Sequence, residues 1–423
     1  MHQLRLISLS LVFMFGFTAS ATSADQTLPN QSWSQWRGPQ RDGTLPGTAL
    51  PDSLSEQNLQ LRWQLPLSPG YSGPIVTADR VFVTETVNEE TEVVRALDRQ
   101  TGKELWKQSW PGAISVPFFA KANGDWIRAT PAFDGERLYV AGIRDVLVCL
   151  DAASGSILWR LDFVEQLKSS LPSFGFASSP LVADEAVYVQ AGGGFCKVNK
   201  LTGEVIWRVL EDGGGMFGSA FSSPCLAELD GVQQILVQTR TTLAGVDPES
   251  GQVFWEQKIP AFRGMNILTP AVVNNTVFTS SYGGRSFLFD ITRNDGNWQV
   301  KELWSNTIQG YMSSPIILDG YIYLHLKNQR FTCLDLKTGK AVWTTAPYGK
   351  YWSMVTDGQK ILALDQKGEL LLIKASPKKF DLIDQRKVAD DSWAHLAVSG
   401  KDLFIRDLKQ LSVYQAEQAS LKN

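Results

Sequence analysis

The chain has few of the residues that build metal centres and disulfide frameworks. Its 423 residues include three histidines and four cysteines, and none of these lies at metal-ligand spacing from another. The cysteines are far apart, and Cys149 and Cys333 hold equivalent positions in the similar segments LVCLD and FTCLD. The sequence therefore predicts no metal site and favours buried, unpaired cysteines, with a disulfide as the alternative.

Signatures of the common catalytic machineries are also missing. There is no G-x-S-x-G elbow, Walker loop or dinucleotide-binding fingerprint. The glycine-rich segments AGGGF (191–195) and DGGGMFGS (212–219) are not followed by a helical pattern, so we interpret them as turns. The net charge of −3 argues against a nucleic acid partner.

Only one long apolar run is present, at the N-terminus, and no later segment approaches the length of a membrane helix. Arg5 precedes the run and small residues follow it, which predicts a secretory signal peptide at residues 1–24, cleaved after Ala21 or Ala24. A buried first helix is the alternative. No cysteine lies near the predicted cleavage site, so we expect an exported chain, periplasmic or secreted, with no membrane span and no lipid anchor.

What the sequence does contain is a repeat. Each unit has an Asp or Asn, a Thr-Gly or Ser-Gly pair and a final Trp. The Asp side chain can accept hydrogen bonds from amides two residues on, and Gly can adopt positive φ, so we interpret D-x-x-[TS]-G as a hairpin turn. A degraded copy ends at Trp304 and a fainter copy at Phe380. The clear units are ALDRQTGKELW (96–106), CLDAASGSILW (149–159), KVNKLTGEVIW (197–207), GVDPESGQVFW (245–255) and CLDLKTGKAVW (333–343).

A second apolar element precedes each unit and occurs eight times, one time more than the units that end in an aromatic residue. Each period therefore predicts four short strands, which is the pattern of a propeller blade. The last period lacks its fourth strand, and the unassigned N-terminal segment NLQLRWQL (58–65) supplies one. We predict an all-β fold, an eight-bladed β-propeller of four-stranded antiparallel blades, with the last blade closed by the N-terminal strand. A stray strand on an open seven-bladed array is the alternative.

The tryptophan that ends each unit has a predicted structural role. A large flat ring at the end of an outer strand can bury on the order of 200 Å² against the neighbouring blade. We therefore expect these side chains to dock one blade on the next. They are Trp63, Trp106, Trp159, Trp207, Trp255, Trp304 and Trp343.

The repeat resembles the PQQ-type, quinoprotein alcohol dehydrogenase-like β-propeller repeat proteins, and the chain is similar to the exported group related to BamB. The resemblance covers the predicted propeller at residues 58–416. An N-terminal arm at residues 25–57, including SQWRGPQRDGT (34–44), precedes the propeller, and a tail follows at residues 417–423. We expect the arm to lie across the ring with Trp33 and Trp36 as anchors.

This resemblance implies two better-known activities, and the chain departs from both. Quinoprotein dehydrogenases carry an adjacent-cysteine disulfide and calcium ligands that have no counterpart here, so we expect no cofactor, with PQQ and calcium as the alternative. BamB is a lipid-anchored outer-membrane assembly factor, whereas this chain lacks the cysteine for that anchor. An enzyme is therefore the less favoured interpretation.

One end of the predicted disc carries the candidate binding residues. Seven consecutive loops that precede inner strands are rich in aromatic residues and methionine, and six of the eight connections from second to third strand carry a cation. We predict an electropositive binding face; loops that merely plug the channel are the alternative. The candidates are Arg128, Arg144, Arg240, Arg263, Arg285, Arg330, Tyr311, Tyr351, Trp352 and Trp393.

Within that face, Arg263 and Trp352 are the strongest candidates, and we expect both to contribute little to stability because loop residues usually do so. The sequence thus predicts an exported, soluble binding or protein-interaction module, monomeric and without quinone catalysis. Its partner would be a protein or peptide, and an anionic ligand would suit the cations. The alternatives are a PQQ-dependent oxidoreductase and a BamB-like role in outer-membrane assembly.

Overall fold

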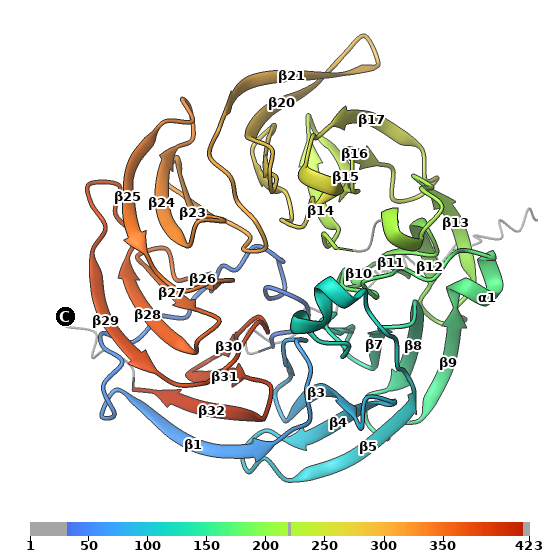
Figure 1. Ribbon diagram of the computed structural model, residues 1–423, viewed down its shortest axis with the longest axis vertical. Helices are drawn as coiled ribbons and strands as arrows, with labels where there is room; N and C mark the ends of the chain where they lie inside the picture. Colours follow the sequence, from blue (N-terminus) through green and yellow to red (C-terminus); the bar gives the residue numbers. More distant parts are fainter. Residues whose placement is uncertain (1–31, 219–220, 418–423) are drawn as a thin grey trace, which may run out of the picture.

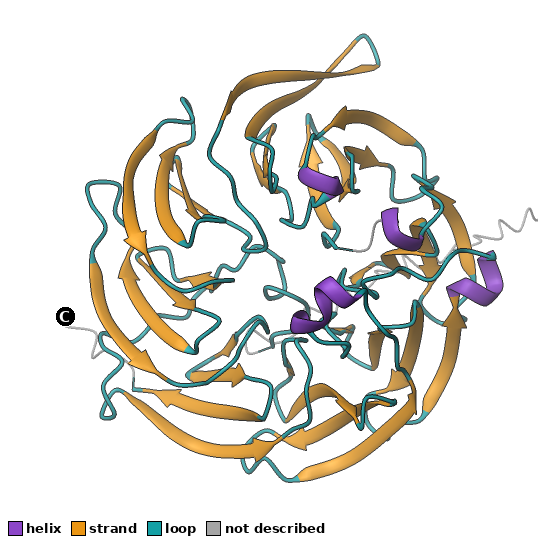
Figure 2. Cartoon of the chain, viewed as in Figure 1, coloured by secondary structure: helices purple, strands orange, loops and turns teal. Residues whose placement is uncertain are grey.

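The computed structural model describes residues 32–218 and 221–417, so the predicted signal peptide lies outside the described residues. Eight four-stranded antiparallel sheets stand around a central axis like the blades of a propeller (Figure 1). The predicted fold is confirmed, and helix in the described residues is confined to a few short turns (Figure 2).

The first four blades follow the chain in order, each from its inner to its outer strand. Blade 1 is β2 (Ile75–Val76), β3 (Arg80–Val87), β4 (Thr91–Asp98) and β5 (Glu104–Pro111). Blade 2 is β6 (Ala132–Phe133), β7 (Arg137–Gly142), β8 (Val146–Asp151) and β9 (Ile157–Asp162). Blade 3 is β10 (Leu181–Ala183), β11 (Ala186–Ala191), β12 (Gly194–Asn199) and β13 (Val205–Val209). Blade 4 is β14 (Cys225–Leu229), β15 (Val232–Gln238), β16 (Thr242–Val246) and β17 (Val253–Lys258).

The remaining blades continue this order. Blade 5 is β18 (Ala271–Val273), β19 (Thr276–Ser280), β20 (Ser286–Asn294) and β21 (Asn297–Asn306). Blade 6 is β22 (Ile316–Leu318), β23 (Tyr321–His325), β24 (Arg330–Asp335) and β25 (Ala341–Pro347). Blade 7 is β26 (Ser353–Thr356), β27 (Lys360–Leu364), β28 (Glu369–Lys374) and β29 (Leu382–Lys387). Blade 8 is β30 (Ala397–Ser399), β31 (Asp402–Arg406), β32 (Gln410–Ala416) and β1 (Leu59–Pro66).

Blade 8 joins the two ends of the chain. Strand β1 pairs antiparallel with β32, and Trp63 lies opposite Val413. In Figure 1 the blue β1 lies along the red β32. The predicted closure is confirmed, and it removes two exposed sheet edges that would otherwise invite aggregation.

The connections in the described part of the chain contain four short helical turns: η1 (Phe118–Asn123), η2 (Gly215–Phe217), η3 (Phe262–Gly264) and α1 (Phe163–Leu167). The carboxylate of Asp162 caps α1 by accepting from the Glu165 amide. Within the described part of the chain, no helix has the length and apolar character needed to cross a membrane.

Each Asp-containing turn is built as its sequence predicts. In blade 1 the Asp98 carboxylate accepts hydrogen bonds from the amides of Gln100 and Thr101, and Gly102 has φ of +71°. The ring of Trp63, from blade 8, lies against Gly102, and its Nε1–H donates to the carbonyl of Arg99 at 3.1 Å. A Cβ on Gly102 would come within 2.6 Å of that ring, so the turn requires glycine both for its φ and for the contact.

The same contact recurs around the ring. An indole Nε1–H of one blade donates to a turn carbonyl of the next for the pairs Trp106 and Ala152, Trp159 and Lys200, Trp207 and Glu249, Trp304 and Leu336, and Trp343 and Ser376. Trp255 is the exception, because its Nε1–H donates to Gln234 Oε1 within its own blade. The next blade offers it no Asp-x-x-Thr-Gly turn, since β20 and β21 continue into a longer hairpin.

The described part of the arm fills the centre of the ring, where a blue trace crosses it in Figure 1. Trp33 is buried and pairs with Val76 of blade 1. Arg41 donates to the carbonyls of Ser179 and Pro180 of blade 3, and Arg37 donates to the carbonyl of Pro315 ahead of blade 6. The arm therefore connects inner strands on opposite sides of the channel.

All four cysteines are buried and unpaired. Cys149 and Cys333 lie on the third strands of blades 2 and 6, where burial raises the pKa of each thiol. The interpretation of the cysteines as small apolar core residues is confirmed, and the disulfide alternative is wrong.

Because β1 closes the ring, removing its tryptophan, Trp63, should destabilise the fold. We expect Trp63→Ala to lower the free energy of unfolding by about 3 kcal/mol, because the ring packs on the turn of blade 1. Leu61→Ala is the matched control on the same strand; Leu61 is 47% exposed and its loss should cost no more than about 0.5 kcal/mol. Urea unfolding measures both, and equal stability of the two variants would contradict the role of Trp63.

Candidate functional site

A cavity of about 720 Å³ opens at the channel mouth, on the side of the loops that precede the inner strands. Trp36 of the arm and residues of those loops line it, together with Arg240 from the connection between β15 and β16. Seven of the ten predicted site residues belong to its lining: Arg128, Arg240, Arg263, Tyr311, Tyr351, Trp352 and Trp393.

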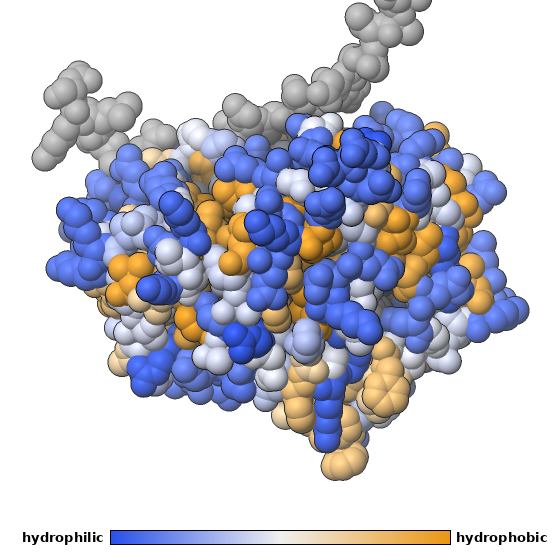
Figure 3. Space-filling model, turned by 90° about the horizontal axis from the view of Figure 1, so that it is seen from above, coloured by the Kyte–Doolittle hydropathy of each residue, from blue (hydrophilic) through white to orange (hydrophobic). Residues whose placement is uncertain are grey.

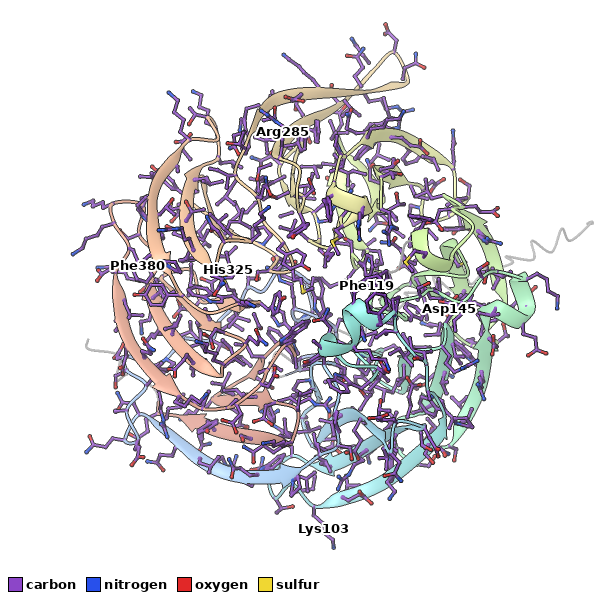
Figure 4. The ribbon with its side chains drawn as sticks, viewed as in Figure 1. Lys103, Phe119, Asp145, Arg285, His325 and Phe380 are labelled. Carbon is purple, nitrogen blue, oxygen red and sulfur yellow. The ribbon has the colours of Figure 1, made fainter. Side chains whose placement is uncertain are left out.

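Three predicted residues, Arg144, Arg285 and Arg330, are not part of the lining. Their side chains donate to Ala113 O, Ser305 Oγ and Thr345 O respectively. Arg144 and Arg285 lie on connections between the second and third strands, and Arg330 is the first residue of β24, the third strand of blade 6. Figure 4 shows Arg285 toward the outside of the disc and Phe119 near its centre. Arg240 lies on the corresponding connection of blade 4 and does line the cavity, so the connections between second and third strands do not all stand apart from the mouth.

The aromatic side chains around the mouth form two arcs of touching rings. We call the first the phenylalanine arc: Phe118, Phe119, Phe174 and Phe221, with ring centroids 5.5, 6.1 and 5.8 Å apart in that order. The second is the tyrosine arc, with centroid separations from 4.1 to 6.0 Å. It consists of Phe262, Tyr282, Tyr311, Tyr351, Trp393, Tyr71 and Trp126.

Arginines stand where the two arcs meet. The guanidinium of Arg240 lies 5.4 Å from the ring centroid of Phe221, and that of Arg263 lies 5.2 Å from Phe262. Arg240 Nη2–H also donates to the carbonyl of Arg263, whose backbone has a positive φ of 52°. The loop before blade 5 is thus held by Arg240, and its own arginine is left exposed above Phe262.

The short helical turns η1, η2 and η3 carry apolar side chains that project into solvent at the cavity mouth, and we call these side chains the rim. Phe118 is 86% exposed and Phe217 is 74% exposed, and Phe119, Phe262 and Met216 are exposed as well. All five lie on η1, η2 or η3. Figure 3 shows apolar side chains projecting from one face of the disc, beside hydrophilic ones. An apolar group this exposed is typical of a contact surface.

The charge of the cavity is positive. Its described lining includes three arginines and no aspartate or glutamate. Arg37 and Arg41 of the arm add two buried guanidinium groups, 5.6 and 5.8 Å from the ring of Trp36. Burial lowers the pKa of each to about 10, so both remain cations at neutral pH. Burial also raises the pKa of Tyr71 and Tyr311, which keeps their hydroxyls protonated as hydrogen-bond donors.

Trp352 lines the cavity but is a packing residue. It is 2% exposed, and its ring stacks on His325 with centroids 4.9 Å apart and packs on Phe331 at 4.9 Å. Its burial contradicts the premise of the expectation that it contributes little to stability, which was that Trp352 is a loop residue away from the core. Its position next to the first residue of β26 places it in the core between blades 6 and 7, a distinction that loop membership in the sequence does not reveal.

The wall of the cavity contains hydroxyl residues that the sequence reasoning did not single out. Most of them directly precede a proline at the start of an inner strand, which is a signal that could have found them. Each hydroxyl oxygen accepts a hydrogen bond from a backbone amide of a neighbouring blade. The pairs are Gly73 to Thr130, Thr130 to Ser179, Ser179 to Ser223, Ser223 to Thr269, Thr269 to Ser314 and Leu396 to Ser353.

Two buried carboxylates outside the cavity connect neighbouring blades. Glu92 accepts from the Ile143 amide and from Trp110 Nε1, and Asp145 accepts from the Gly192 amide. Burial raises the pKa of each carboxyl group to about 7. Such a pKa is common for catalytic acids, but here the groups hold the turns of adjacent blades and are not part of the cavity lining.

The donor set does not fit the calcium-bound quinone of the dehydrogenases. Calcium prefers six to eight oxygen ligands, largely carboxylates. The described cavity lining offers none, and the described residues include no cluster of three or more His, Cys, Asp or Glu side chains suited to a metal ion. The cavity can instead offer cations, hydroxyl donors and aromatic faces.

Comparisons with known proteins agree with the propeller. A family model described as outer membrane protein assembly factor BamB matches residues 90–345. BamB of Moranella endobia (strain PCIT) is 26% identical over 330 residues, covering 75% of this chain and 77% of that protein. The crystal structure of BamB from Moraxella catarrhalis has a TM-score of 0.63 at 16% identity, covering 84% of this chain and 99% of that chain. The crystal structure of quinohemoprotein alcohol dehydrogenase from Comamonas testosteroni has a TM-score of 0.69 at 13% identity, and the match covers 93% of this chain and 82% of that chain. At these identities the two structures share the fold with this chain, and a shared fold alone does not define activity.

The different burial of the two strongest candidates predicts different effects on stability. We expect Trp352→Ala to lower the free energy of unfolding by about 3 to 5 kcal/mol, since it opens a cavity between Phe331 and His325. Arg263→Ala should change it by no more than about 0.5 kcal/mol, because the side chain is exposed. Thermal and urea unfolding of both variants checks this, and similar losses would contradict it.

The buried histidine beside Trp352 predicts a pH dependence. Burial lowers the pKa of His325 from 6.5 to about 4, so below pH 6.5 the unfolded chain takes up a proton that the folded chain does not. Stability relative to His325→Gln should therefore fall by about 1.4 kcal/mol per pH unit between pH 6.5 and about 4. Above pH 6.5 the difference between the two proteins should be constant. Parallel stability curves over the whole range would refute the assignment.

Proposed function

The chain belongs to the family described as outer membrane protein assembly factor BamB, and on this premise we propose that it is an exported interaction module that serves outer-membrane protein assembly. Its partner is a protein, and it binds at the channel mouth. We further propose that the chain performs no quinone chemistry. The predicted signal peptide supports export, and the poor fit of the cavity to calcium argues against calcium-dependent quinone chemistry.

The observation that carries this proposal is the exposed apolar rim. Phe118, Phe217 and Phe262 stand on three separate turns at one edge of the mouth, more than half exposed in each case. Burying such side chains against a partner contributes roughly 25 cal/mol per Å² of apolar area. The outer strands carry exposed apolar residues too, such as Leu158 and Ile206, but these point outward around the circumference. The rim gathers large aromatic side chains around a cavity, as protein contact surfaces do.

Genetic complementation tests the proposal. In the source organism, loss of the chain should lower the amount of folded outer-membrane proteins, measured in isolated outer membranes. The wild-type gene should restore that amount, whereas the double variant Phe118→Ser with Phe217→Ser should not, because it removes the contact surface.

Leu158→Ser with Ile206→Ser is the matched control, since both residues are nearly half exposed on outer strands. This control should restore outer-membrane proteins as the wild-type gene does, and both double variants should melt within a few degrees of wild type. Unchanged outer-membrane proteins after loss of the chain would refute the assembly role. Full complementation by the rim variant would refute the rim as the contact surface.

A further inference from the structure

We infer that the channel mouth binds an extended, acidic segment of a partner protein, with a carboxylate held between the two aromatic arcs and apolar side chains on either side of it. This inference rests on the proposed function and specifies the chemistry of the partner. It also distinguishes the mouth from a general apolar surface, because it requires negative charge in the partner.

The junction of the arcs provides the anchor for the carboxylate. Arg240 lies over Phe221 at the end of the phenylalanine arc, and Arg263 lies over Phe262 at the start of the tyrosine arc. Because Arg240 donates to the carbonyl of Arg263, the two residues are fixed relative to each other. An aromatic ring beside a guanidinium shields part of it from water. Because less water then competes for the guanidinium, its hydrogen bonds to a carboxylate are stronger.

Charge complementarity favours an acidic segment over a neutral one. Arg128 and the two arm arginines add positive charge around and beneath the cavity, whose described lining contains no carboxylate. Burial lowers the pKa of Arg128 to about 10 and also lowers the pKa of Arg240. Tyr71 and Asp125 oppose this effect at Arg128, and Asp212 opposes it at Arg240. Neither Asp125 nor Asp212 lines the cavity. Arg263 forms no ion pair among the described residues and is exposed, so it is the cation best placed to receive a partner's carboxylate.

The shape of the mouth favours a chain segment. The cavity volume of about 720 Å³ is large enough for several side chains and falls within the usual range of roughly 300 to 1,000 Å³ for ligand sites. The phenylalanine arc continues outward from the cavity to Phe118, which is almost fully exposed. A segment that lies along this arc keeps its apolar residues on the rings while its acidic residue reaches the arginines.

Fluorescence anisotropy with short labelled peptides tests the inference. The probe alternates Glu and Phe, and the comparison peptides replace Glu by Gln or by Lys. We expect the Glu-Phe probe to bind most tightly, and its affinity to fall with added salt because the charge term is screened. Arg263→Glu should weaken its binding by at least about tenfold, as expected when an attractive charge becomes repulsive.

Arg285→Glu is the matched control, because Arg285 is an exposed arginine of the same blade that does not line the cavity. It should change the affinity by less than about twofold, the level expected for a screened, distant charge. Phe217→Ser should weaken binding of the Glu-Phe probe at low and at high salt alike. A wild-type protein that binds the Lys-Phe peptide as well as the Glu-Phe probe, or that binds neither, would overturn the inference, as would equal affinities of Arg263→Glu and Arg285→Glu.

The inference and the proposed function fail in different experiments. If the rim variant fails to complement but the probe shows no preference for glutamate, the assembly role stands and the acidic specificity is wrong. If the probe binds as expected but loss of the chain leaves outer-membrane proteins unchanged, the mouth binds acidic segments in another process and the assembly role is wrong.

Discussion

The contact between the outer strand of one blade and the turn of the next is the constraint on which the structure depends. A four-stranded blade has two faces to bury, and in a ring each face is covered by a neighbour. Indole rings lie on turn glycines such as Gly102, Gly155 and Gly203, where any side chain would collide with them. The contact must also be made between the last blade and the first, which is why β1 has to return to β32 and carry Trp63.

Closure of the ring places the inner strands around a central channel, where their backbone polar groups need hydrogen-bond partners. The two ends of the channel differ in how it is filled. The arm crosses the channel and satisfies inner carbonyls with Arg37 and Arg41, so that polar backbone groups in the centre are paired. At the other end the loops remain long and aromatic, with Trp36 beneath them, and the cavity is left open. The asymmetry of the disc therefore gives it one face suited to binding.

Aromatic residues serve two opposite purposes in this molecule. Trp352, stacked on His325, and Trp63, packed on Gly102, hold blades together. Phe118 and Phe217 on the rim are exposed instead. Aromatic character alone does not distinguish the buried rings from the exposed ones. What separates the two groups is the position of the backbone. Trp63 on the outer strand β1 and Trp352 beside the inner strand β26 each pack between two blades, whereas Phe118 and Phe217 lie on short helical turns and remain largely exposed among the described residues. Composition alone predicts an aromatic face but not which of its members are exposed.

The repeats by themselves determined the number of blades, the Asp and Gly turns and the closing role of residues 58–65, because each of these depends on local spacing and on a pattern that recurs. The same sequence predicted aromatic loops at one end of the disc, and the cavity lies at that end. Only the tertiary structure decided which cations share the cavity, since Arg263 lines it whereas Arg285 of the same blade does not and donates to Ser305. It also decided the partnership of Trp255 with Gln234 and the place of Arg37 in the channel. Radius, burial and contacts between distant segments arise from the closing of the ring, and local sequence carries no record of them.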